Sequence, residues 1–303
     1  MKKDIVSILD LTEAEFHQVI DLAVRLKEQR ALGQNHSLGK RYTLGMIFEK
    51  ASTRTRISFE VGMFELGGHA LFLNPHDMQL GRGEIIEDTA KVLSRYLSAV
   101  MIRSKSHDTV KELAMHASIP VINGLSSLEH PCQILADVMT MRERFGSLEG
   151  LQVAWVGDGN NVCNSLILAS ALAGYSIRIA TPDAFAPDAT VLLKADEIGA
   201  SYTICGTPAE AVRGADVVYT DTWVSMGDEE EKEKRLRAFE GYCVDEELVS
   251  MAADRAIVMH CLPAHRGEEI TPGVIDGEQS VVWDQAENRL HAQKALLSLL
   301  LER

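Results

Sequence analysis

Residues 43–66 read TLGMIFEKASTRTRISFEVGMFEL, and they place the polar run Ser52-Thr53-Arg54-Thr55-Arg56 between two apolar patterns. The run from Thr43 to Phe48 predicts a strand, and the spacing of apolar residues from Ile57 to Leu66 predicts a helix. The first N–H groups of a helix lack intrahelical partners, and the helix dipole is positive there. Hydroxyl donors and guanidinium groups at that point favour an anion, and phosphate in particular. The structural alternative is a serine-capped helix with a solvated basic first turn.

The composition is that of a globular protein with room for two hydrophobic cores. The chain has 303 residues, of which 46% are hydrophobic and 24% are charged, so we expect two domains. The net charge of -14 argues against nucleic-acid and anionic-membrane partners, because phosphate backbones and such membranes attract a basic face. An anionic substrate must therefore be attracted by local charge. No apolar run in the sequence is long enough to span a membrane.

The cysteines indicate reduced thiols in a cytoplasmic protein. They are odd in number, widely spaced and without a Cys-x-x-Cys pair, so they predict neither a disulfide framework nor a metal site. The five are Cys132, Cys163, Cys205, Cys243 and Cys261.

The first half of the chain alternates helices and strands. After the helix expected over residues 12–32, strands are predicted at 43–48, 70–73, 99–103 and 120–123, with helices between them. This βαβ rhythm predicts a parallel sheet. A helix over residues 134–145 then leads into the second half.

The second half repeats the rhythm, with strands predicted at 151–156, 176–180, 201–205, 216–220, 256–260 and 280–283. We therefore predict an α/β protein with two doubly wound parallel-sheet domains joined by a connecting helix, and a C-terminal helix that crosses back to the first domain. The predicted domains are residues 1–138, completed by 286–303, and residues 139–285. The charged run 228–235, acidic first and basic later, is interpreted as a solvated helix face.

Polar residues follow the predicted strands, and ligands of open α/β sheets bind at the carboxyl ends of strands. The first domain offers Ser52 to Arg56, Arg103 and the run His130-Pro131-Cys132-Gln133, which can donate to an anion and a carbonyl. The second domain offers a carboxylate and a thiol, which suit an amine. Its candidates are Asn160, Asn161, Asp221 and the run His260-Cys261-Leu262-Pro263. Taken singly, each lone His, Asn or Cys is better explained as a core or capping residue.

A different function, hydride transfer with a bound dinucleotide, is indicated by the run Gly157-Asp158-Gly159-Asn160-Asn161-Val162. The third glycine position of the dinucleotide fingerprint is Val162, however, and no acidic residue ends the strand 176–180. The fingerprint is therefore only half present.

Four motifs together resemble the aspartate/ornithine carbamoyltransferase family over the whole chain. They are Ser52-Thr53-Arg54-Thr55-Arg56, His130-Pro131-Cys132-Gln133, Asp221-Thr222-Trp223-Val224-Ser225-Met226-Gly227 and His260-Cys261-Leu262-Pro263. The first two are shared across the family, and the last two resemble its ornithine branch rather than its aspartate branch. The resemblance implies transfer of the carbamoyl group of carbamoyl phosphate to the δ-amine of L-ornithine, giving citrulline and phosphate, as in arginine metabolism. It also implies a homotrimer or a multiple of trimers, and neither a metal nor an organic cofactor.

The resemblance also implies roles for individual residues. Carbamoyl phosphate would contact Ser52, Thr53, Arg54, Thr55, Arg103, His130, Gln133, Cys261, Leu262 and Arg289, together with Gln79 reaching in from a neighbouring subunit. Ornithine would contact Asn161, Asp221, Ser225 and Met226. The residues closest to the chemistry would be Arg103, His130, Asp221, Cys261 and Arg289.

Two demands of this reaction can be met by these residues. Thr55, Arg103 and His130 can donate to the oxyanion of a tetrahedral intermediate, and Asp221 with Cys261 can hold the amine. Arg56 either neutralises phosphate charge or is structural. Carbamoyl transfer to another amine, such as putrescine or an acylated ornithine, and a non-catalytic binding protein are the remaining alternatives.

Overall fold

The computed structural model describes residues 3–34, 36–39, 41–78, 83–224 and 231–302. The chain divides into two compact units, of which unit 1 comprises Met1–Met139 with Glu287–Arg303 and unit 2 comprises Thr140–Ala286. Two helices, α5 (Pro131–Phe145) and α12 (Val282–Leu301), carry residues of both units. Within the described residues, none of the helices combines the length and the apolar character that a bilayer span requires.

Unit 1 contains a four-stranded parallel sheet with the strand order β2-β1-β3-β4. Its strands are β1 (Thr43–Phe48), β2 (His69–Leu73), β3 (Ala99–Arg103) and β4 (Val121–Leu125). Its other helices are α1 (Glu13–Ala31), α2 (Thr53–Glu65), α3 (Ile86–Tyr96) and α4 (His107–His116), with short 3-10 turns at Ile8–Asp10 and Pro75–Asp77.

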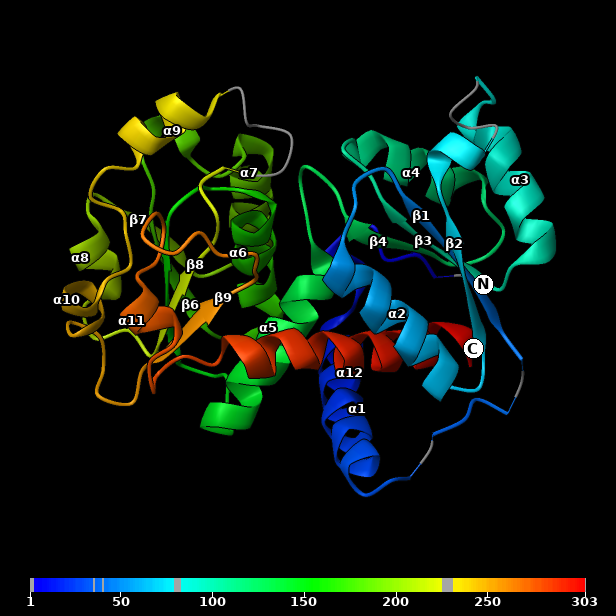
Figure 1. Ribbon diagram of the computed structural model, residues 1–303, viewed down its shortest axis with the longest axis horizontal. Helices are drawn as coiled ribbons and strands as arrows, with labels where there is room; N and C mark the ends of the chain where they lie inside the picture. The colour runs from blue at the N-terminus through cyan, green and yellow to red at the C-terminus, as the bar shows by residue number, and fades with distance from the viewer. Residues whose placement is uncertain (1–2, 35, 40, 79–82, 225–230, 303) are drawn as a thin grey trace. The chain divides into compact units, whose positions relative to one another are not determined.

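Helices cover both faces of this sheet, with α3 and α4 on one side and α1, α2 and α12 on the other (Figure 1). The first side is closed by a cluster that joins Ile47, Val100 and Ile102 of the strands to helix residues such as Ala90 and Val110. Burial on both faces explains why the strand sequences are continuous apolar runs rather than alternating ones.

Unit 2 contains a five-stranded parallel sheet with the order β7-β6-β5-β8-β9. Its strands are β5 (Gln152–Val156), β6 (Ser176–Ala180), β7 (Tyr202–Cys205), β8 (Val217–Thr220) and β9 (Ile257–His260). Its remaining helices are α6 (Asn161–Ala173), α7 (Ala189–Ile198), α8 (Pro208–Val212), α9 (Lys232–Ala238), α10 (Glu246–Val249) and α11 (Pro272–Ile275), with a 3-10 turn at Asp183–Phe185.

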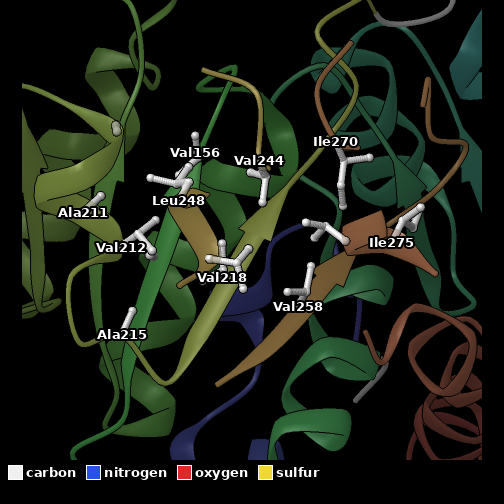
Figure 2. Close-up of a cluster of buried hydrophobic side chains, with 14 of the residues drawn as sticks. Val156, Ala211, Val212, Ala215, Val218, Val244, Leu248, Val258, Ile270 and Ile275 are labelled. Carbon is white, nitrogen blue, oxygen red and sulfur yellow. The ribbon is translucent and has the colours of Figure 1, made fainter. Parts of the chain in front are cut away.

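The core on one face of this sheet joins β5, β8 and β9 to the helices that cover them. Figure 2 shows Val156, Val218 and Val258 of these strands in one cluster with Leu248 of α10 and Ile275 of α11. Because β-branched side chains stand close together on a pleated surface, they fill the space under short helices without long side chains. The strand order reverses between β5 and β8, which is where open α/β sheets bind ligands.

Two parallel sheets confirm the predicted fold class, but one predicted strand is wrong. Residues 280–283 form no strand: Ser280 makes a single bridge to Val258, and α12 begins at Val282. A short apolar run cannot be assigned to strand or helix by its periodicity alone. Here the run ends in the first turn of the long helix α12 instead of adding a sixth strand.

Parallel pairing brings the candidate residues of unit 1 to one edge of the sheet. Phe48, the last residue of β1, is in register with Arg103, the last residue of β3. The N–H of Glu49 donates to the carbonyl of Arg103 at 3.0 Å. Ser52, which opens α2, therefore follows a strand end that lies beside Arg103.

Candidate active site

The polar run at 52–56 forms the N-cap and first turn of α2, which begins at Thr53, four residues before the stretch 57–66 over which the helix was predicted. Ser52 is the N-cap, and its hydroxyl accepts a hydrogen bond from the N–H of Thr55 at 3.3 Å. The first turn contains no acidic residue. With Thr53 and Arg54 in that turn, the positive end of the helix dipole is reinforced and not neutralised. The local structure is that of an anion site.

Arg289 of α12 joins this helix start to the beginning of α5. Its guanidinium donates to the side-chain oxygen of Gln133 at 2.6 Å and to the hydroxyl of Thr55 at 3.2 Å. Arg289 is 3% exposed, and the side chains of Gln133 and Thr55 are buried as well. Three elements that are far apart in the sequence, α2, α5 and α12, therefore bring their candidate side chains together.

His130, directly before α5, lies in a strongly positive environment. Burial lowers the pKa of its imidazole well below the usual value, and the charges of Arg289, Arg103 and Arg54 lower that pKa further. At neutral pH the ring is therefore uncharged and keeps one N–H for donation. The three arginines come from α12, β3 and α2. All three charges therefore act in the same direction on the pKa of one ring in unit 1.

Arg56 does not share the arrangement of the other arginines. Its guanidinium lies 3.1 Å from Glu60, one turn further along α2, and 4.1 Å from the centre of the Phe72 ring. An exposed i, i+4 ion pair and a cation–π contact are ordinary surface interactions. Of the two roles considered for Arg56, these contacts favour the structural one.

Asp221, directly after β8, is the centre of the candidate site in unit 2. One carboxylate oxygen accepts from the Cys261 thiol at 2.8 Å and from the N–H of Thr222 at 2.8 Å. The other oxygen accepts from the side-chain amide of Asn160 at 2.7 Å. Asp221 is 5% exposed, so its charge is poorly screened by water and is available to a cationic amine. The thiol is a donor in this arrangement, which suits positioning better than nucleophilic attack.

The segment that carries Cys261 is held by a buried histidine. The N–H of Leu262 donates to Nδ1 of His260 at 2.9 Å, so Nε2 carries the proton and donates to Glu269 at 3.2 Å. Leu262 has φ of 59°, the left-handed region that non-glycine residues rarely adopt. Such a conformation persists only where neighbouring contacts enforce it. The His260 and Glu269 side chains, both fully buried, provide those contacts.

Gly159, after β5, has a structural role that requires no dinucleotide. A Cβ at Gly159 would lie 2.3 Å from the backbone nitrogen of Pro187 and 2.6 Å from the carbonyl oxygen of Phe185. The Gly159 N–H donates to that same carbonyl at 2.8 Å. The glycine is needed because another segment of the chain, not a pyrophosphate, approaches its backbone.

Within the described ranges, two groups of side chains place possible metal ligands within 4.8 Å of one another. In the first, Asp221, His260 and Cys261, the thiol already donates to the carboxylate. In the second, His265, Glu268 and Glu269, Glu268 pairs with Lys232 at 3.2 Å. Because these groups already bond to one another or to a neighbouring cation, their geometry is explained without a metal. That the protein needs no metal stays a prediction.

Three sequence candidates, Gln79, Ser225 and Met226, lie outside the described residues. Asn161 is the first residue of α6, and its predecessor Asn160 caps that helix and bonds to Asp221. Sequence reasoning offered both asparagines but placed only Asn161 at the substrate. The cap preference of asparagine after a Gly-x-Gly turn is the signal that distinguishes their local roles.

The interpretation of residues 228–235 as a solvated helix face is wrong for Arg235. Its side chain is 13% exposed and pairs with Asp158 at 2.8 Å, whereas Arg237 on the same helix is 83% exposed. Sequence reasoning missed both Arg235 and Asp158. A seven-residue helix such as α9 is too short for its pattern to reveal which charge turns inward.

Comparisons with known proteins match both units of the chain. The family model described as "Aspartate/ornithine carbamoyltransferase, carbamoyl-P binding domain" matches residues 3–143, and the model described as "Aspartate/ornithine carbamoyltransferase, Asp/Orn binding domain" matches residues 149–300. Together they cover nearly all of the chain.

Individual relatives give the same result. The chain is 60% identical to an ornithine carbamoyltransferase of Methanoculleus marisnigri, over 99% of this chain and 97% of that one. It is 61% identical to one of Methanospirillum hungatei, over 99% and 100% of the two chains. The solved structure of ornithine carbamoyltransferase from Pyrococcus furiosus superposes with a TM-score of 0.94 at 50% identity, covering 99% of this chain and 97% of that chain. For the Thermus thermophilus enzyme the TM-score is 0.90 at 42% identity, with 99% coverage of both.

Proposed function

The chain belongs to the aspartate/ornithine carbamoyltransferase family, and from that premise we propose that it transfers the carbamoyl group of carbamoyl phosphate to the δ-amine of L-ornithine. The products are L-citrulline and phosphate. The observation that carries the proposal is the buried Arg289 guanidinium, which donates to Gln133 and to Thr55 at a helix start without acidic residues. Such a site has the charge that a dianionic phosphate requires and an uncharged donor for a carbonyl oxygen.

We assign carbamoyl phosphate binding to unit 1. The phosphate oxygens would accept from the start of α2, at Ser52, Thr53, Arg54 and Thr55, and from Arg103. The carbamoyl group would lie against His130, Gln133 and Arg289. The hydrogen bond from Arg289 to Gln133 orients the Gln133 amide, so that its oxygen faces the guanidinium and its nitrogen the Asp137 carboxylate.

We assign ornithine binding to unit 2. Asp221 would attract the side-chain amine, with Asn161, Ser225 and Met226 as the other contacts. A lysine-like ammonium has a pKa of about 10.4, so the amine must lose a proton before it attacks. Asp221 and the Cys261 thiol, hydrogen-bonded to each other, would hold the amine and its leaving proton. Leu262 would contribute its backbone beside both substrates.

The proposed step needs no covalent enzyme intermediate. The lone pair of the neutral δ-nitrogen forms a bond to the carbamoyl carbon, and the carbonyl becomes an oxyanion that Thr55, Arg103 and His130 stabilise. The oxyanion then collapses, the carbon–oxygen bond to phosphate breaks, and phosphate leaves. The nitrogen gives up one proton, which the departing phosphate takes up as HPO4²⁻, so the atoms and charges balance.

We propose a trimer, or a multiple of trimers, in which Gln79 completes the site of a neighbouring subunit. Support comes from large apolar side chains exposed on α2, β2 and α3 of unit 1, where association would bury them. They are Ile57, Phe64, Leu71, Phe72, Val92 and Tyr96. A cytoplasmic location and a place in arginine metabolism complete the proposal, with five reduced cysteines in support of the first.

The test is citrulline formation from carbamoyl phosphate, with ornithine compared against putrescine, N-acetylornithine and aspartate at equal concentration. We expect strong turnover with ornithine alone. Preference for another amine would refute the assignment of unit 2 and leave that of unit 1 standing. Absence of turnover with every amine would refute the proposed activity. Sedimentation of the active protein tests the trimer independently.

A further inference from the structure

The residue before His130 is held through both of its backbone polar groups by Ser126. The N–H of Ser126 donates to the carbonyl oxygen of Glu129 at 2.9 Å, and the N–H of Glu129 donates to the Ser126 hydroxyl at 3.2 Å. The first of these bonds engages the peptide group that joins Glu129 to His130. Two hydrogen bonds to one residue therefore determine how the chain enters His130.

The Ser126 hydroxyl is itself held in one orientation. Its oxygen accepts from the Glu129 N–H and, at 3.3 Å, from the side-chain amide of Asn123. Nδ1 of His107, the first residue of α4, lies 2.8 Å from the same oxygen. A hydroxyl group has one proton to donate and two lone pairs with which to accept. These three partners match that capacity.

The charge state of His107 allows its ring to accept the hydroxyl proton. Burial lowers the pKa of the ring, and the neighbouring charge of Lys111 lowers that pKa further. The ring is therefore neutral at pH 7 and keeps one nitrogen without a proton. The alternative acceptor for the hydroxyl proton, the carbonyl oxygen of Glu129, lies farther away at 3.3 Å.

Buried polar side chains connect the loop at residues 126–130 to other parts of unit 1. Asn123, in β4, is fully buried, and its amide also donates to the carbonyl oxygen of Val6 at 2.9 Å. The Glu129 side chain is buried, and its carboxylate accepts from the N–H of Ile8 at 3.0 Å. Because a hydrogen bond left unmade at a buried polar group is costly, such a network admits few arrangements.

The chain is fixed after His130 as well. The His130 carbonyl oxygen accepts from the N–H of Gln133 at 3.0 Å, which joins it to the first turn of α5. With the backbone held before and after it, the buried imidazole leaves the chain in a defined direction. A donor to an oxyanion is effective only within a narrow range of positions, and a displacement of about 1 Å can cost about 100-fold in rate.

We propose that Ser126 is a positioning residue for His130: its hydroxyl fixes the residue before the ring and so directs the imidazole to the carbonyl oxygen of the carbamoyl group. The inference rests on the proposed carbamoyl transfer. Ser126 touches neither substrate in this assignment, so its effect passes through His130. The effect is therefore expected on kcat, while KM for ornithine, which is assigned to unit 2, should stay within about twofold.

Ser126→Ala tests the proposal in two backgrounds, wild type and His130→Ala, with citrulline formation as the assay. In the wild-type background kcat should fall by about 10-fold to 100-fold, because the donor is displaced and not removed. In the His130→Ala background the same change should cost less than about twofold, because two residues that act as one unit are not additive. A hydroxyl that only supported folding would lower activity in both backgrounds.

Ser298→Ala is the matched control, and thermal unfolding monitors folding in every variant. Ser298 is also fully buried in unit 1, and its hydroxyl donates to the carbonyl oxygen of Lys294 at 3.0 Å. Its replacement should lower stability to a similar extent but leave kcat within about twofold of wild type.

Ser126→Cys, in the same two backgrounds, keeps the size of the side chain and weakens its hydrogen bonds, so its kcat should lie between those of wild type and Ser126→Ala. This variant decides the question if Ser126→Ala does not fold. Equal losses in the two backgrounds would overturn the inference, as would an unchanged kcat in the wild-type background. If wild-type protein forms no citrulline, or if His130→Ala keeps its kcat, the proposed function or the role of His130 has failed, which is a different result from equal losses in the two backgrounds.

Discussion

Replacement of Arg289 by methionine removes the charge that joins α12 to the proposed carbamoyl phosphate site. Methionine keeps most of the side-chain volume, so the buried position is refilled by an unbranched apolar chain. Gln133 and Thr55 each lose the hydrogen bond that Arg289 donates, at 2.6 Å to Gln133 and at 3.2 Å to Thr55. His130 loses the neighbouring charge that, of the three, lowers the pKa of its ring most.

The expected loss follows from these contacts. A donor that stabilises an oxyanion contributes about 2.7–4 kcal/mol, so kcat should fall by about 100-fold to 1,000-fold. Two buried side chains left without their donor should reduce the free energy of unfolding by about 1–3 kcal/mol. The pKa of His130 should rise, because a neighbouring positive charge has been removed.

Three measurements separate a catalytic effect from a structural one. Citrulline formation gives kcat and both KM values, thermal unfolding gives the change in stability, and a magnetic resonance titration of ring-labelled histidine gives the direction of the pKa change. Lys294→Met is the matched control. Lys294 is also a buried cation of α12, 3% exposed, and its ammonium pairs with Glu65 at 2.6 Å, away from the charges that act on His130.

We expect Lys294→Met to lose stability but to keep kcat within a few-fold of wild type. If Arg289→Met also kept kcat within about tenfold of wild type, or if both variants lost activity equally, the assignment of Arg289 to the carbamoyl group would be wrong. An unchanged pKa of His130 would refute the electrostatic part of the reasoning even if activity fell.

Three further predictions concern single residues of the two units. Arg103→Ala should lower kcat by about 100-fold to 1,000-fold in the citrulline assay, because it removes another donor to the oxyanion, and a loss below tenfold would contradict that role. Asp221→Asn should raise KM for ornithine while calorimetry shows carbamoyl phosphate binding nearly unchanged, since Asp221 lies in unit 2; a collapse of carbamoyl phosphate affinity would refute the division of labour. The pKa of His130 is depressed on folding, so the unfolded chain takes up its proton first as the pH falls below about 6.5, and stability present above that pH is lost by about 1.4 kcal/mol per pH unit. His130→Asn should flatten thermal stability between pH 7 and pH 5, and parallel curves for variant and wild type would show that the buried ring is not the cause.

Local sequence determined most of the elements. The strand 43–48 appears where predicted, and the helix predicted over 57–66 is present but begins at Thr53, because apolar runs, caps and helix periodicity act within a few residues. The prediction of a strand at 280–283 is wrong, because a four-residue apolar run carries too little periodicity to separate a strand from the beginning of a helix.

The roles of individual charges were decided by tertiary structure. Within the run 52–56, Arg54 acts on the pKa of His130 whereas Arg56 turns to Glu60 and Phe72. Likewise Arg235 is half-buried and pairs with Asp158, while Arg237 is exposed. The sequence by itself determined which segments form strands and helices and which residue types follow the strand ends, because these are short-range properties. Only the tertiary structure decided which charge faces inward, because that depends on partners supplied by segments far away in the chain, and the cost of burying a charge makes those partners necessary.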